Sequence, residues 1–150
     1  MKAKVKWTKG MLFEGLSDSN TVLMDARPPL GLNQGMTPKE LVANGLGGCT
    51  AMDVIALLKK HKQVFDSFEV DVEITSTTAG HPIVFQNALL TFSATGNIDK
   101  TIYLDSVKLS QTKYCGVSAM LAKALPIKYN VVLNNEKIGE GEAHFEDAGK

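Results

Sequence analysis

The first residues of the chain alternate between polar and apolar side chains. Along residues 2–7 lysines alternate with alanine, valine and tryptophan. This period of two is typical of a β-strand with one face in water. A turn at Lys9-Gly10 follows, and the apolar runs 11–15 and 21–25 predict two more strands. We therefore expect three short antiparallel strands at the start of the fold.

The clearest helix signal follows a loop over residues 27–36, which contains two prolines and two glycines. Thr37 is a suitable N-cap, Pro38 fits the first helical position, and Glu40 lies three residues after Thr37. This arrangement predicts a capping box. Because no proline interrupts the chain before Lys62, the helix is expected to run for about 25 residues, or about 38 Å.

The predicted helix is unusually apolar and rich in glycine. Residues 41–52 carry no charge, and Gly45, Gly47 and Gly48 fall within this stretch. Each glycine destabilises a helix by about 1 kcal/mol relative to alanine, which is tolerated where another backbone approaches closely. A helix that is apolar on all sides is expected to be buried on all sides. This is hard to satisfy within one chain of 150 residues.

The remaining pattern predicts strands over 68–78 and 83–94, helices over 101–111 and 114–124, and a last strand over 128–133. The resulting order is βββ–α–ββ–αα–β. Such an order is typical of an α+β fold in which helices pack against an antiparallel sheet.

Length and charge narrow the possible functions. The 150 residues fit a single domain, 1–150, and the formal net charge is zero. A neutral chain does not favour nucleic acid or an anionic membrane surface as a partner. We expect no window close to the 18–20 apolar residues of a membrane span. The N-terminus has no apolar run of the kind found in signal peptides, so we expect a cytoplasmic protein.

The chain contains two cysteines, Cys49 and Cys115. In a reducing compartment they are buried thiols, metal ligands or reactive groups rather than a permanent disulfide. Cys49 falls within the apolar helix, where it could simply fill a small gap. Cys115 falls in the first turn of a predicted helix, where free N–H groups are expected to lower the pKa of its thiol. Two roles of the cysteines, packing as small buried side chains and redox chemistry, therefore stay open at this point.

Metal binding is not expected, because the cysteines are far apart and the three histidines are scattered. Asp53 lies one helical turn after Cys49, so its carboxylate could contact that thiol. A carboxylate there would raise the pKa of the thiol. A capping or packing role is therefore the preferred interpretation of Asp53. The capping box alone explains Glu40.

Three motifs together resemble the OsmC/Ohr family, most closely its YhfA-like branch. They are Gly-Met-Thr-Pro-Lys-Glu-Leu at 35–41, Gly-Gly-Cys-Thr-Ala-Met-Asp-Val at 47–54, and Leu-Ser…Lys-Tyr-Cys-Gly-Val at 109–117. The resemblance spans nearly the whole chain, because the order of elements also matches. It implies an intertwined homodimer in which two long helices pack together between sheets shared by both chains.

The resemblance also implies an activity, the reduction of organic hydroperoxides. A thiolate at the position of Cys49 attacks the O–O bond of an apolar hydroperoxide, which leaves an alcohol and a sulfenic acid. A thiol at the position of Cys115 condenses with the sulfenic acid to a disulfide. A small or lipoyl-type dithiol then reduces this disulfide, and no bound cofactor is needed.

Family peroxidases also use an arginine and a glutamate beside the reactive thiol. Arg27 is the only arginine in the chain, and it precedes the helix as in the OsmC branch. The usual glutamate position holds Lys39, and Glu40 follows one residue later. Two alternatives therefore stay open. One is a catalytically weak dimer that binds an apolar ligand or senses oxidation. The other is a structural dimer in which both cysteines only fill space in the core.

Overall fold

The computed structural model describes residues 1–146 of the chain. By their internal contacts, the residues divide into two compact units, Met1–Val42 and Ala43–Lys150. The single domain inferred from the length of the chain remains a prediction.

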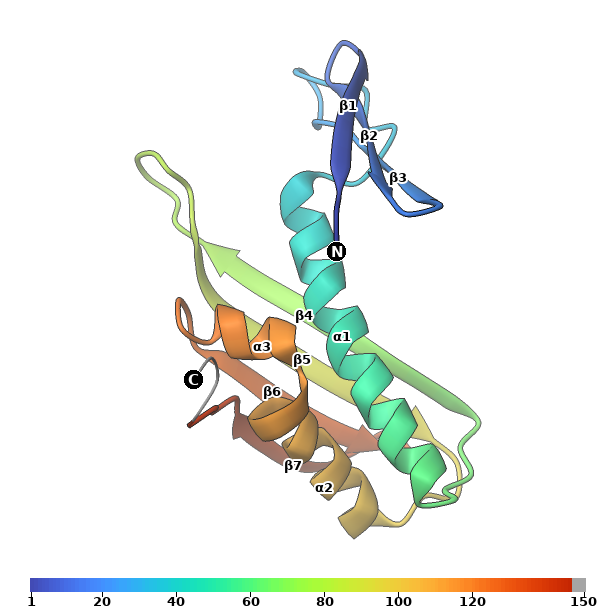
Figure 1. Cartoon of the computed structure of the whole chain (residues 1–150). Helices are drawn as coiled ribbons and strands as arrows, with labels where there is room; N and C mark the ends of the chain where they lie inside the picture. The colour runs from blue at the N-terminus through green and yellow to red at the C-terminus, as the bar shows by residue number, and fades with distance from the viewer. Residues whose placement is uncertain (147–150) are drawn as a thin grey trace. The chain divides into compact units, whose positions relative to one another are not determined.

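The first unit contains a three-stranded antiparallel sheet, drawn in blue in Figure 1. Its strands are β1 (Lys4–Lys9), β2 (Leu12–Ser17) and β3 (Asn20–Met24), in the order β1-β2-β3. The register pairs Trp7 with Phe13 and Gly15 with Val22. The three strands predicted from the period of two are confirmed.

This first sheet has almost no core of its own. Within Met1–Val42 the buried side chains are Leu12 and Asp25. Every residue of β1 is exposed, and Trp7 retains 62% of its accessible surface. A three-stranded sheet usually needs a covered apolar face to be stable. The apolar face of this sheet is therefore a surface that another element is expected to cover.

Asp25 organises the loop that follows β3. Its carboxylate accepts the backbone N–H groups of Ala26 at 2.7 Å, Gln34 at 3.0 Å and Leu32 at 3.2 Å. These bonds, the one from Gln34 first, hold the pKa of Asp25 below its usual value. Gly31 is required here, because a Cβ atom would lie 2.3 Å from the Ala26 carbonyl oxygen. The loop predicted over 27–36 thus has a defined conformation.

The long helix α1 (Pro38–Lys60) begins at the predicted residue. Its buried side chains lie along one face, and they are Leu46, Gly47, Thr50, Val54 and Leu58. Met52 on another face keeps 75% of its surface exposed. In the single chain its own sheet covers only one face of the helix, in line with the expectation that one chain can hardly bury all its sides. Burial of the remaining sides stays a prediction.

The expectation that no window approaches a membrane span is wrong. An 18-residue window of α1 has a mean hydropathy of 1.6, so the helix is long and apolar enough to cross a membrane by length and composition alone. Leucine, glycine and alanine are the commonest residues of this apolar stretch, and at most two charged residues interrupt the window. One such helix is weak evidence, since the core helix of a water-soluble protein has the same composition.

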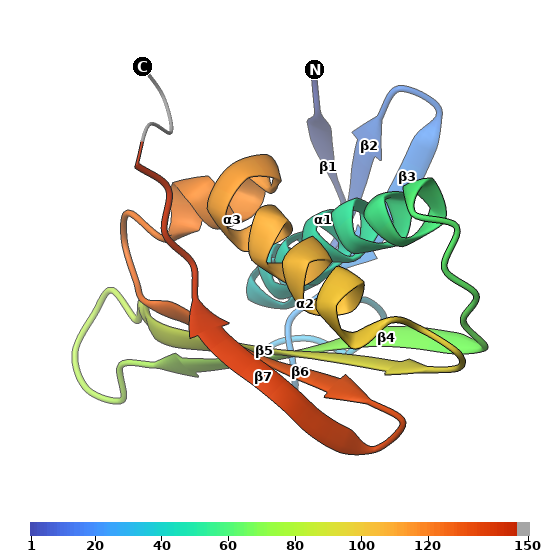
Figure 2. The same cartoon turned by 90° about the horizontal axis from the view of Figure 1, so that it is seen from below.

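The second unit is built on a four-stranded sheet. Its strands are β4 (Ser67–Ser76), β5 (Phe85–Thr95), β6 (Ile127–Leu133) and β7 (Glu136–Glu142), in the order β4-β5-β6-β7. Figure 2 shows the helices of this unit on one face of the sheet. The α+β class and the OsmC-like order of elements are confirmed.

Two details of this sheet differ from the sequence prediction. The pair β5–β6 is parallel, whereas an antiparallel sheet was expected. The helical segment between the two strands carries the chain back to the starting edge, which makes a parallel pair possible. Strand β7 was not predicted, because glycine and charged residues hide its alternation. It follows a tight turn in which Asn134 and Asn135 both have positive φ, at 50° and 66°.

The core lies between the helices and the sheet. It joins one face of α1 to inward-facing side chains of β5 and β6, including Leu46, Val54, Phe92 and Val131. Phe92 packs edge-on against Tyr129, with ring centroids 6.3 Å apart. The shared core between α1 and the strands fixes the position of the helix on the sheet.

The chain between β5 and β6 contains three helical segments. They are α2 (Lys100–Leu109), the π-helical turn η1 (Ser110–Tyr114) and α3 (Gly116–Leu121). The sequence predicted two helices at these positions, and the π-helical turn was not foreseen. Such turns often occur at functional sites, because the additional residue redirects the side chains that follow. Cys115 comes directly after this turn.

Candidate active site

The two cysteines meet in the second unit, together with Asp53. The sulfur atoms of Cys49 and Cys115 and a carboxylate oxygen of Asp53 all lie within 4.8 Å of one another. Both cysteines are free thiols. Cys49 and Cys115 are far apart along the chain, and the fold brings them together from α1 and from the start of α3.

Close packing positions Cys49 on α1. The helix lies so near to β4 that a Cβ atom on Gly47 would be 2.9 Å from the Val72 side chain. The Thr50 hydroxyl donates a hydrogen bond to the Gly47 carbonyl at 2.9 Å. The close neighbour of Gly47 is thus a side chain of β4, so the predicted approach of another backbone stays a prediction. Cys49 lies two residues after Gly47 and is half-buried. The thiol of Cys49 is the more accessible of the two.

The N-cap of α3 holds Cys115. Its backbone N–H donates to the Ser110 carbonyl at 3.0 Å, and its Sγ atom accepts the N–H of Ser118 at 3.3 Å. Burial first, and a hydrogen bond with Cys49 second, raise the pKa of the Cys115 thiol to about 11, although the bonds with Ser118 lower it in part. The predicted lowering of this pKa is wrong, because the cost of burying a charge outweighs the effect of one short helix.

Asp53 lies on the same face of α1 as Cys49, one turn later. Ser110 donates its hydroxyl to Asp53 Oδ2 at 3.0 Å, and Gln111 Nε2 donates to the Ser110 hydroxyl at 3.3 Å. Burial raises the pKa of the Asp53 carboxyl, which the bond from Ser110 partly offsets. Sequence reasoning favoured packing or capping for this residue. The four-residue spacing from Cys49 was the available signal.

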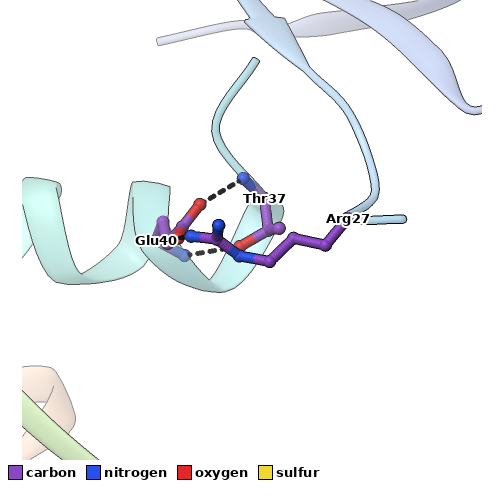
Figure 3. A network of polar contacts seen from close by, with 3 residues as sticks. All are labelled: Arg27, Thr37 and Glu40. Carbon is purple, nitrogen blue, oxygen red and sulfur yellow. Dashed lines mark hydrogen bonds and ion pairs between the residues drawn. The ribbon is translucent and has the colours of Figure 1, made fainter. Parts of the chain in front are cut away.

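The two other predicted site residues pair with each other in the first unit. Arg27 forms an ion pair with Glu40, as Figure 3 shows. The other Glu40 oxygen accepts the N–H of Thr37 at 2.7 Å, and the Thr37 hydroxyl accepts the N–H of Glu40 at 3.3 Å. The capping box is confirmed. The bond from Thr37 first, and Arg27 second, hold the pKa of Glu40 below its usual value.

The four predicted residues thus form two pairs, Cys49 with Cys115 and Arg27 with Glu40. Each pair lies within one of the two compact units. The guanidinium and carboxylate are partly exposed, with side-chain exposures of 62% and 37%. The Arg27–Glu40 pair therefore presents a fixed charged group at a surface.

A cavity of about 940 Å³ adjoins Cys115. Its walls combine apolar and basic side chains, and the lining residues include Lys108, Lys113, Tyr114, Met120, Lys123, His144 and Phe145. Such a lining suits an amphipathic molecule with a negative charge. Cys115 itself is fully buried, so the cavity lies beside the thiol rather than over it.

The trio Cys49, Asp53 and Cys115 also offers metal ligands, which the sequence spacing did not indicate. Zinc accepts sulfur and carboxylate ligands, but a closed structural site normally has four. The trio supplies three. We interpret the cluster as a thiol site, and the expectation that the protein holds no metal remains a prediction.

Comparison with known proteins identifies the family of the chain. Residues 31–130 match the family model described as OsmC-like protein. The chain belongs to the OsmC-like family. It is 35% identical to Protein YhfA of Escherichia coli K12 over 133 residues, which cover 87% of this chain and 96% of that protein. The resemblance to the OsmC/Ohr family and its YhfA-like branch is confirmed.

Solved structures of OsmC-like proteins share the fold. An OsmC-like protein of Mycoplasma pneumoniae superposes with a TM-score of 0.77 at 16% identity, covering 88% of this chain and 95% of that one. An organic hydroperoxide resistance protein of Legionella pneumophila superposes with a TM-score of 0.65 at 16% identity, covering 88% and 95%. At this identity the likeness establishes the fold of this OsmC-like protein.

Proposed function

We propose that this protein is a thiol-dependent peroxidase that reduces organic hydroperoxides to alcohols and thereby protects against oxidative stress. The proposal rests on one observation, the approach of the Cys49 and Cys115 sulfur atoms to within 4.8 Å. A disulfide requires a sulfur–sulfur distance of about 2.05 Å, so the two sulfur atoms must move closer together for the bond to form. No resident cofactor is required.

The reaction has three steps. The Cys49 thiolate attacks the O–O bond, so that an alcohol leaves after taking up a proton and Cys49 becomes a sulfenic acid. The Cys115 thiol then attacks the Cys49 sulfur, which forms a disulfide and releases water. A small or lipoyl-type dithiol reduces the disulfide by thiol–disulfide exchange and is itself oxidised to a disulfide.

Exposure and pKa support the roles that we propose for the two thiols. Cys49 is half-buried and can meet a substrate, whereas Cys115 is fully buried. Burial raises the pKa of Cys115 to about 11, so at neutral pH it is almost entirely a thiol and a poor first nucleophile. Cys49 is therefore the peroxidatic residue and Cys115 the resolving residue.

The family context supports the substrate class. One protein with this fold, from Legionella pneumophila, is described as an organic hydroperoxide resistance protein. Apolar side chains such as Tyr114, Met120 and Phe145 lie in the cavity beside Cys115. They favour an alkyl or fatty-acid hydroperoxide over hydrogen peroxide. The proposed setting is the cytoplasm, without a nucleic-acid or membrane partner.

We further propose that the working protein is a homodimer. The first sheet has an uncovered apolar face, and the exposed side of α1 carries Met52 and the glycines Gly45 and Gly48. A Cβ atom at either glycine would meet nothing within 4 Å in the single chain. A second copy packed on this side would cover the helix. We also propose that Arg27 and Glu40 serve the reaction, with the guanidinium stabilising the thiolate of Cys49.

A second candidate function is a catalytically weak dimer that binds an apolar ligand or senses oxidation. Two observations favour it. Glu40 is already engaged by Thr37 and Arg27 in the capping box, and a cavity of about 940 Å³ adjoins Cys115. Such a protein would form the disulfide slowly and hold an amphipathic molecule in the cavity.

The test is dithiol-dependent consumption of cumene hydroperoxide by the wild type, Cys49→Ser and Cys115→Ser. We expect consumption by the wild type at least 100 times faster than by Cys49→Ser. The Cys115→Ser variant should accumulate a Cys49 sulfenic acid, which dimedone traps for mass spectrometry. The matched control is hydrogen peroxide, which should be consumed more slowly by the wild type.

Consumption by the wild type no faster than by Cys49→Ser would contradict the peroxidase. Native mass spectrometry of the purified protein would then examine the second candidate. A copurified apolar or amphipathic molecule would support ligand binding.

A further inference from the structure

We propose that Asp53 is a catalytic residue of the resolving step, in which its carboxylate takes the proton of the Cys115 thiol and passes it to the hydroxyl that leaves Cys49. This inference rests on the proposed peroxidase function. It assigns a role to a carboxylate that the capping box and the Arg27–Glu40 pair do not involve.

The resolving step needs a base because Cys115 is buried and protonated. A neutral thiol attacks a sulfenic acid slowly, since the thiolate is the nucleophile. The other charged groups near Cys115 line the adjacent cavity, and they are Lys108, Lys113, Lys123, His144 and Glu146. Within residues 1–146, the carboxylate grouped with both sulfur atoms is that of Asp53, within 4.8 Å of each.

The fold holds Asp53 in place for this task. Its position four residues after Cys49 puts both side chains on one face of α1. Ser110, which is fully buried, donates to Oδ2 at 3.0 Å and is itself held by Gln111 at 3.3 Å. This chain of bonds comes from the π-helical turn η1 that also places Cys115. One structural device therefore orients the base and the thiol together.

A purely structural role explains Asp53 less well. It lies in the middle of α1, far from the first turn, where a carboxylate would cap the helix. Asp53 is half-buried, which makes its charged form less favourable, and one neutral hydroxyl is its hydrogen-bond donor among residues 1–146. Burial raises its pKa, which suits a group that holds a proton briefly.

The step balances without any further reactant. The Cys115 sulfur forms a bond to the Cys49 sulfur as the bond between that sulfur and its oxygen breaks. The Cys115 proton moves to Asp53 and then to the departing oxygen, which leaves as water. Cys115 is oxidised, the sulfenic sulfur of Cys49 is reduced, and the Asp53 carboxylate is regenerated.

The test separates the two chemical steps in single-turnover experiments. Wild type, Asp53→Asn and Asp105→Asn, each with both thiols reduced, receive one equivalent of cumene hydroperoxide. Samples are quenched with dimedone and analysed by mass spectrometry for the sulfenic acid and the disulfide. Asp105 is an exposed carboxylate on α2 and serves as the matched control.

We expect Asp53→Asn to slow the conversion of the sulfenic acid to the disulfide by about 100-fold, the usual range for a lost general base. Formation of the sulfenic acid should not slow, because removal of a negative charge beside Cys49 favours its thiolate. The resolving rate of the variant should rise about tenfold per pH unit as Cys115 ionises, whereas the wild-type rate should change little between pH 6 and 8.

Two results would overturn the role of Asp53. One is a resolving rate of Asp53→Asn equal to that of the wild type. The other is an equal slowing of both steps with parallel pH profiles, which would indicate a structural defect. Ser110→Ala provides a second variant, since it keeps the carboxylate and removes its hydrogen bond. It should slow the resolving step several-fold, and an unchanged rate in a folded Ser110→Ala would contradict the assigned geometry.

The same experiment distinguishes this inference from the proposed function. If the wild type forms neither sulfenic acid nor disulfide, the peroxidase proposal fails. If the wild type forms the disulfide rapidly and Asp53→Asn does so equally well, only the role of Asp53 fails.

Discussion

The backbone N–H of Ser118 donates a hydrogen bond to the Sγ atom of Cys115 at 3.3 Å, and yet burial keeps this thiol protonated. An N–H donor at a helix start normally favours a thiolate. Helix α3 has only six residues, and the side chain has no exposed surface. The loss of water around a charged sulfur therefore outweighs the bonds with Ser118 that would stabilise it.

This balance predicts the pH dependence of Cys115 alkylation. Because the pKa is raised to about 11, its reaction with iodoacetamide should increase about tenfold per pH unit from pH 7 to pH 10. Peptide mass spectrometry of the reduced protein measures the rate. Alkylation of Cys49 in the same sample shows whether the iodoacetamide is active. A Cys115 rate that levels off below pH 9 would show that the thiol ionises more easily than its burial implies.

The capping box predicts a loss of stability in acid. The folded pKa of Glu40 lies below its usual value, so its ionised form stabilises the fold above that value. This stabilisation should disappear as the pH falls through the folded pKa, from about pH 5 downward. The free energy of unfolding, measured with urea between pH 3 and 7, should fall less with decreasing pH in Glu40→Gln than in the wild type. The exposed Glu69→Gln is the control, and it should decline as the wild type does.

A separate prediction concerns Arg27. Its partly exposed ion pair contributes little to stability, so Arg27→Lys should change the free energy of unfolding by less than about 0.5 kcal/mol. Peroxidase kcat/KM should fall at least tenfold, because lysine cannot present a planar fork of donors. Lys100→Ala, which removes the exposed pair with Glu136, is the matched control for activity. Unchanged activity in Arg27→Lys would remove this residue from the site.

Local patterns in the sequence were sufficient for most of the fold. The capping residues Thr37 and Pro38 predicted the start of α1 at the observed residue, and the period of two in 2–7 predicted a strand that the structure contains two residues later, at Lys4–Lys9. These signals depend on neighbouring residues only. Strand β7 was missed because its stability comes from pairing with β6 rather than from its own composition.

The site was predictable only in part. The resemblance pointed to Cys49 and Cys115, but burial decides the pKa of Cys115, and the sequence does not show how deeply a side chain is buried. Asp53 was assigned to packing, since its contact with Cys115 depends on the π-helical turn at 110–114. Such a turn has no reliable sequence signal.

The glycines of α1 predict where a second copy would pack. Gly45 and Gly48 face open space in the single chain, so alanine at either position should stabilise the helix itself by about 1 kcal/mol. If a partner helix packs closely on this side, each alanine would instead hold the two backbones apart. We therefore expect Gly48→Ala to weaken self-association at least tenfold.

Sedimentation velocity over a dilution series would measure this association for Gly45→Ala, Gly48→Ala and Gly47→Ala. The last variant is the control, because its methyl group meets Val72 within the same chain, 2.9 Å away. It should lower the stability of the fold, since the helix must shift from β4, whereas the other two should act on the dimer. Gly45→Ala and Gly48→Ala could instead associate as strongly as the wild type and have a higher free energy of unfolding. The dimer contact would then lie on another surface. The uncovered face of the first sheet around Trp7 would then be the surface to examine, because it also leaves apolar side chains in water in the single chain.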